Sequence, residues 1–139
     1  MTTTGNTSSP ASGTATRLRR RWPIWLFRIT ITAAAILAFN QAVFAGQFLS
    51  GTYPALRLHR DMANYTVAAI AASIITAILW RRAGAGPRWP LPAAVALFAL
   101  TALQTFLGYR LVLAVHIPLG VTVILLLVAL TAAAWRPTR

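Results

Sequence analysis

The chain has 139 residues, of which 58% are hydrophobic and 10% are charged, and its net charge is +12. Apolar blocks that approach the roughly 20 residues needed to cross a bilayer as a helix exclude an ordinary soluble domain. The absence of cysteine excludes disulfides, thiolate metal sites and thiol redox chemistry. The 13 basic residues are all arginines, and they gather at the ends of the apolar blocks. Membrane topology accounts for that placement better than nucleic-acid binding does.

The first two predicted segments are a basic tail over residues 1–21 and a helix over residues 24–48. Residues 1–16 are rich in Thr, Ser, Gly and Ala, which bury too little apolar surface to fold, so we expect disorder. Cleavage of the first apolar block as a signal peptide after Ala45 is the alternative. It is disfavoured because the apolar run is longer than the usual signal core of about 7–15 residues.

Three more helices are predicted in the rest of the chain. Pro54 suits a first helical turn, so the second helix covers residues 54–80, and Gly and Pro residues follow it. The third helix covers 90–108, the fourth covers 111–135, and 137–139 form a short tail. Backbone polar groups inside lipid must be satisfied internally, which helices achieve. The expected fold class is therefore all-α, with a four-helix transmembrane domain over residues 22–136.

Charged and aromatic residues predict one orientation of these helices. With four spans, only Arg57, Arg60 and Arg110 flank the membrane side away from the termini, and Arg28 lies near the start of the first helix. All five tryptophans fall on the terminal side, where an aromatic belt is expected. We expect an up-down-up-down bundle in a bacterial plasma membrane with both termini cytoplasmic. The nine arginines that flank the terminal side are Arg17, Arg19, Arg20, Arg21, Arg81, Arg82, Arg88, Arg136 and Arg139.

The two histidines fall at matching depths in the second and fourth predicted helices. Each of His59 and His116 is five residues after the predicted start of its helix, and therefore lies roughly 7–8 Å inside it. Those helices are diagonal and parallel in an up-down-up-down bundle, so the imidazoles can face one another across its centre. Ala63 and Gly120, each four residues after a histidine, lie on the same helix face and leave room beside each ring.

Two facing imidazoles are a pair of axial ligands for haem iron, whereas two nitrogens alone make a poor closed zinc site. Arg57, Arg60 and Arg110 lie on the histidine side, and a guanidinium pairs well with carboxylates such as the haem propionates. These residues predict a haem site with both histidines as metal ligands.

Gln41 and Gln104 lie in the first and third helices, and their matching places indicate a weak internal duplication. They are further candidate site residues, although glutamines also form hydrogen bonds between membrane helices. The arginines can likewise extend to lipid headgroups. On that interpretation the protein is a non-haem accessory or assembly subunit of a larger membrane complex. A proton-coupled exporter is disfavoured, because the only acidic residue, Asp61, lies too near the membrane surface.

Four short motifs are His59-Arg60, Leu103-Gln104, Leu107-Gly108 and Ala114-x-His116. With these motifs, residues 36–130 resemble one four-helix half of the haem A synthase family. They are also similar to small four-helix bacterial membrane proteins with the same two histidines. The resemblance implies that the histidines of the second and fourth helices ligate haem.

The chain departs from the synthase pattern in three ways. It has one such half rather than two, Leu56 stands where a carboxylate is expected, and the loop cysteines are absent. We therefore expect haem b binding rather than haem hydroxylation, and no autonomous catalysis. With both axial positions filled, electron transfer or haem handling is the expected function, with a quinone or a redox protein as partner. A homodimer would recreate the two halves of the synthase.

Overall fold

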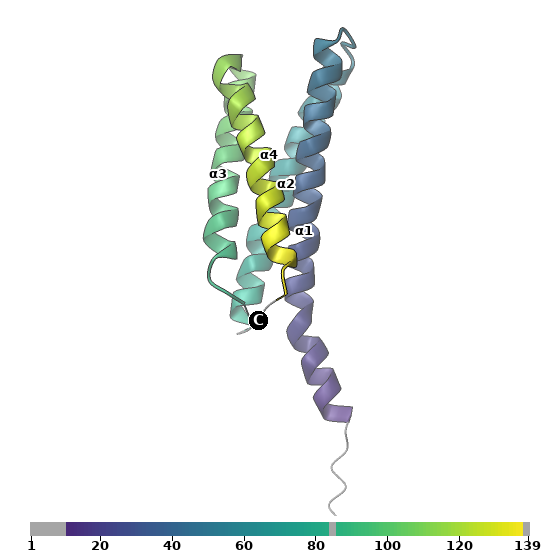
Figure 1. Ribbon diagram of the computed structural model, residues 1–139, viewed down its shortest axis with the longest axis vertical. Helices are drawn as coiled ribbons and strands as arrows, with labels where there is room; N and C mark the ends of the chain where they lie inside the picture. The colour runs from purple at the N-terminus through teal and green to yellow at the C-terminus, as the bar shows by residue number, and fades with distance from the viewer. Residues whose placement is uncertain (1–10, 84–85, 138–139) are drawn as a thin grey trace, which may run out of the picture.

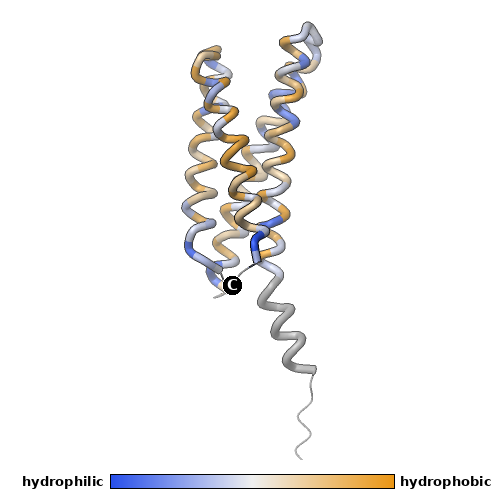
Figure 2. Tube along the Cα trace, viewed as in Figure 1, coloured by the Kyte–Doolittle hydropathy of each residue, from blue (hydrophilic) through white to orange (hydrophobic). Residues whose placement is uncertain are grey.

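The computed structural model describes residues 11–83 and 86–137, in which every regular element is an α-helix. The helices are α1 (Ala11–Leu49), α2 (Ala55–Arg82), α3 (Pro90–Tyr109) and α4 (Leu113–Trp135). Each contains a segment long and apolar enough to cross a membrane. Figure 2 shows apolar residues along α2, α3 and α4 and along the coloured part of α1. The all-helical fold and the four long apolar helices predicted from the sequence are therefore confirmed.

The start of α1 differs from the prediction, whereas the other helix ends agree within two residues. α1 begins at Ala11 rather than at Ile24, so residues 11–21, which were assigned to the disordered tail, continue the helix. The prediction considered only the apolar surface these residues could bury, whereas extending an existing helix adds a backbone hydrogen bond for each residue fixed. The disorder predicted for residues 1–10 lies outside the described residues, as do residues 138–139 of the short tail.

The helices pack in a ring in which α1 and α3 each contact both α2 and α4. Figure 1 shows the α1–α2 and α3–α4 connections at one end of the molecule, and the α2–α3 connection and the C-terminus at the other. α2 and α4, which carry the histidines, are therefore diagonally opposite.

The hydrophobic core lies in the half of the molecule near the C-terminus. Phe27 and Ile31 of α1 are fully buried there, together with Ile70 of α2 and Leu127 of α4. The ring of Phe27 packs against that of Trp80 at a centroid distance of 5.8 Å. Close packing of this kind is what holds apolar helices together in lipid, where no hydrophobic driving force acts between them.

Arg28 joins α1 to the C-terminal end of α4. Its Nε donates a hydrogen bond to the carbonyl oxygen of Ala134 at 2.8 Å. Its guanidinium carbon lies 5.2 Å from the ring centroid of Trp25 and 5.1 Å from that of Trp135. A cation is favourable here because the last carbonyls of a helix lack partners and carry partial negative charge. This contact and the core together hold one end of the bundle closed.

At the other end, the α1–α2 hairpin and the α3–α4 hairpin diverge (Figure 1). The first hairpin turns through Gly51, whose φ of 96° suits a glycine. The second turns through Leu111, whose φ of 57° is uncommon for a residue with a side chain. The space between the two hairpins contains the two histidines that the sequence analysis selected.

Candidate functional site

Two cavities lie where the hairpins diverge. The first has a volume of about 290 Å³ and is lined mainly by α1 and α4. The second has a volume of about 220 Å³ and is lined by residues from all four helices. The two imidazoles are part of a wall common to both cavities. The residues that line both are Gln41, Ala45, Leu49, His59, His116 and Ile117.

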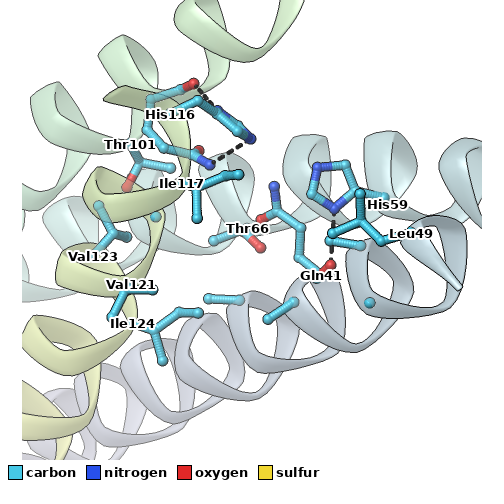
Figure 3. A pocket seen from close by; sticks show the side chains of 16 residues that line it. Gln41, Leu49, His59, Thr66, Thr101, His116, Ile117, Val121, Val123 and Ile124 are labelled. Atoms are coloured by element: carbon cyan, nitrogen blue, oxygen red, sulfur yellow. Dashed lines mark hydrogen bonds between the residues drawn. The ribbon is translucent and has the colours of Figure 1, made fainter. Parts of the chain in front are cut away.

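The structure brings the two histidines together from diagonal helices. The ring centroids of His59 and His116 are 6.2 Å apart, and the ring planes make an angle of 78°. Both side chains are half-buried. In Figure 3 the two rings lie on opposite sides of the cavity, and the nitrogen that each ring leaves free of a backbone bond is directed towards the other ring. Neither imidazole is turned outward to the surface of the bundle.

Each imidazole is oriented by a backbone carbonyl of the preceding helix. Nδ1 of His59 donates to the carbonyl oxygen of Gln41 at 2.8 Å, and Nδ1 of His116 donates to that of Gln104 at 2.8 Å. Because a carbonyl oxygen only accepts hydrogen bonds, Nδ1 carries the proton in both rings. In the neutral tautomer the lone pair is then on Nε2. This is how metal-ligating histidines are usually oriented.

Small residues explain why these mid-helix carbonyls can accept a second hydrogen bond. A helical side chain covers the turn that precedes it, so the residue four positions after Gln41 or Gln104 lies over that carbonyl. Those residues are Ala45 and Gly108. A Cβ at Gly108 would lie 2.7 Å from Cε1 of His116. Only a glycine therefore permits the observed position of the His116 ring.

The Nε2 atoms of the two rings have different surroundings. Nε2 of Gln104 donates a long hydrogen bond, 3.4 Å, to Nε2 of His116. The same carboxamide packs on Gly120, where a Cβ would lie 3.2 Å from the amide nitrogen. No corresponding contact from Gln41 to the ring of His59 is present in the described part of the chain. A ligand of His116 must therefore first displace the Gln104 amide.

The other predicted site residues divide into two groups. Ala63 is buried and lines the second cavity, as does Arg60, while Gly120 lines the first cavity. Arg57 and Arg110 are exposed and line neither cavity. Arg57 lies in the first turn of α2, and Arg110 directly follows α3.

Most residues that line the cavities were not singled out as site residues in the sequence, and four of them have polar groups or close contacts. Thr66 and Thr101 are buried in the first cavity, and each hydroxyl donates to a carbonyl of its own helix. Gly108 and Thr105 line the second cavity, and the Thr105 hydroxyl is buried without a hydrogen-bond partner. Gly108 could have been found from the sequence, because it lies four residues after Gln104. The three threonines have no such sequence signal, because helical threonines are common in membrane proteins.

The donor set determines which metal groups this site suits. The described residues contain no group of three or more His, Cys, Asp or Glu able to hold a metal ion. Two imidazoles cannot complete the coordination of a zinc ion, but a porphyrin supplies four of its own nitrogens and needs only axial ligands. With each nitrogen about 2 Å from a shared metal, two axial rings have centroids about 6 Å apart. The observed centroid separation, 6.2 Å, is close to this distance.

Fold and site together define a class: a four-helix protein, with helices able to span a membrane, that holds two oriented imidazoles in an open cleft. Comparisons with protein-family models, curated proteins and solved structures find no match to the chain.

Proposed function

We propose that the chain is a small integral membrane protein that binds haem b between His59 and His116 and serves in electron transfer or haem handling. The observation that supports it best is the paired orientation of the rings. Each gives its Nδ1 proton to a carbonyl 2.8 Å away and leaves Nε2 directed into the shared cleft. A histidine used only as a contact between helices has no need of this arrangement on both sides of a cavity.

The chain's own residues have distinct parts in this proposal. The two Nε2 atoms hold the iron, and the carbonyls of Gln41 and Gln104 hold the rings in the ligating tautomer. Arg60 lines the second cavity and is the best placed of the arginines to pair with a haem carboxylate. The bound group itself supplies one-electron chemistry. With both imidazoles bound to its iron, the haem would have no position left for oxygen, which favours electron transfer over catalysis.

The proposal includes an up-down-up-down crossing of a bacterial plasma membrane with both termini cytoplasmic. The excess of arginine on the terminal side supports this orientation. The histidines then lie near the non-cytoplasmic face, where a quinone or a redox protein can exchange electrons with the site.

Single cysteines introduced into this cysteine-free chain test the orientation. We expect Thr52→Cys, in the α1–α2 connection, to react with a membrane-impermeant maleimide in intact spheroplasts. Ala83→Cys, just after α2, is expected to react only after the membrane is permeabilised. Both positions are exposed, so accessibility within the protein is matched. The opposite labelling pattern would place the histidines near the cytoplasmic face and overturn the orientation.

The optical spectrum of the detergent-purified protein tests the haem proposal. After expression with ample haem, we expect a sharp Soret band, and separate α and β bands on reduction, as a low-spin bis-imidazole haem produces. Pyridine extraction should identify haem b. A protein that is colourless under these conditions, and takes up no added haemin, contradicts the proposal and favours a non-haem accessory or assembly subunit.

A further inference from the structure

The side chain of Gln41 is an unpaired polar group inside the protein. The residue is only 8% exposed, and its carboxamide makes no hydrogen bond to the described residues, although it keeps some accessible surface in the cavity. It lines both cavities, and Figure 3 shows its amide directed into the first of them. A carboxamide that is bonded to no protein group and opens onto a cavity is free to form hydrogen bonds with a ligand bound there.

Gln104 provides a second carboxamide from the diagonally opposite helix. It is 6% exposed, and within the described residues the long hydrogen bond to His116 is the one hydrogen bond that its side chain makes. Its Oε1 therefore remains available to the cavity. A carboxamide carries both a donor and an acceptor, so a ligand between Gln41 and Gln104 meets both kinds of group from α1 and from α3.

Apart from the two histidines, Thr66 and Thr101, the rest of the first cavity is lined by apolar residues. No arginine, lysine, aspartate or glutamate lines it. Its α1–α4 side is lined by Ala42 of α1 and by Ile117 and Val121 of α4, all three of them exposed. In a membrane these residues face acyl chains. The cavity thus has a polar inner wall and an apolar opening towards lipid, which excludes anionic headgroups and favours a neutral lipophilic ligand.

We propose that this cavity binds the head group of a lipophilic quinone or its quinol. Such a ring carries two oxygens on opposite edges, which match carboxamides placed on opposite sides of the cavity. The oxygens accept hydrogen bonds in the quinone and donate them in the quinol. A glutamine serves both states by turning its amide, without any change of charge. The inference rests on the proposed membrane placement and does not require haem; because His59 and His116 line the same cavity, a bound haem and a bound quinone would compete for part of this space.

Calorimetric titration of the purified protein in detergent tests this binding. The probe is a quinone with a single isoprenoid unit, which is soluble enough to titrate. We expect saturable binding at one site, and about tenfold weaker binding in Gln41→Leu and in Gln104→Leu, because each loses one hydrogen bond. Gln47→Leu, on an exposed position of the same helix α1, is the matched control and should bind as the wild type does.

A second variant tests the opening without touching the glutamines. Val121→Trp, at the exposed edge of the cavity, should weaken binding by obstructing the tail. Unchanged helicity and melting temperature show that each variant is folded. The inference is overturned if the quinone does not bind, if a ring-free isoprenoid alcohol binds as tightly, or if Gln41→Leu matches the wild type.

Optical spectra of the same preparations separate this inference from the haem proposal. Ring-specific quinone binding by a colourless protein supports the inference and contradicts haem. A haem spectrum without quinone binding supports haem and overturns the inference.

Discussion

Replacing either His59 or His116 with glycine is expected to abolish the bis-imidazole spectrum and to lower haem affinity at least about 100-fold. The loss of a partner that only orients a metal ligand lowers metal affinity about 10–100-fold, and the loss of the ligand itself lowers it more. The two rings belong to different hairpins, so neither histidine can replace the other. Haemin titration followed by reduced spectra measures both the affinity and the coordination.

Exposed polar residues on the same helices provide the controls for the histidine variants. Asn64→Ala on α2 and Thr122→Ala on α4 should keep the wild-type spectrum. Free imidazole added to either glycine variant should restore the α and β bands, since the substitution leaves a space of matching shape. A glycine variant that keeps separate α and β bands without added imidazole would show that its histidine is not an iron ligand.

Gly108→Ala is expected to displace the His116 ring and to weaken haem binding at least tenfold. The new Cβ would lie 2.7 Å from Cε1 and 2.9 Å from Nδ1 of His116, which is too close for the present ring position. The ring must move away from the Gln104 carbonyl and lose the 2.8 Å hydrogen bond. We expect the free energy of unfolding to fall by about 1–3 kcal/mol, as for other overpacked sites.

Gly46→Ala, in α1 on the wall of the first cavity, is the control for the effect of the close contact on stability. Nothing lies within 4 Å of a Cβ at this position. The substitution should stabilise the helix by about 0.5–1 kcal/mol, because alanine loses less backbone entropy than glycine. Unfolding titrations and haemin titrations of the two variants give the comparison. Equal behaviour of the two variants would contradict the close contact between Gly108 and His116.

Part of the candidate site could be predicted from the sequence because depth along a helix follows from residue number. The equal distances of His59 and His116 from their helix starts depend only on the rise per residue. Their hydrogen bonds to the carbonyls of Gln41 and Gln104 could not be predicted in the same way. A carbonyl inside a helix already has a backbone partner, and whether it accepts another depends on what packs against it.

The arginines show the same limit. The sequence predicts Arg57, Arg60 and Arg110 on the same side of the membrane, away from the termini. Of these three, only Arg60 lines a cavity. Arg28 belonged to no predicted site, and it contacts the end of α4 across the bundle. Charge patterns determine on which side of a membrane a residue falls, but the rotation of each helix about its axis decides which side chains meet.

The sequence by itself determined that the described chain folds into four long apolar helices, and it determined where three of them begin and all four end to within two residues. Helices are closed by hydrogen bonds between near neighbours, so local composition is enough to specify them. Only the tertiary structure decided that the hairpins pack tightly at one end and diverge at the other, with two imidazoles and two carboxamides in the space between them. Those contacts join residues far apart in the chain, and they depend on how closely the helices approach one another. Small residues such as Gly108 determine that distance.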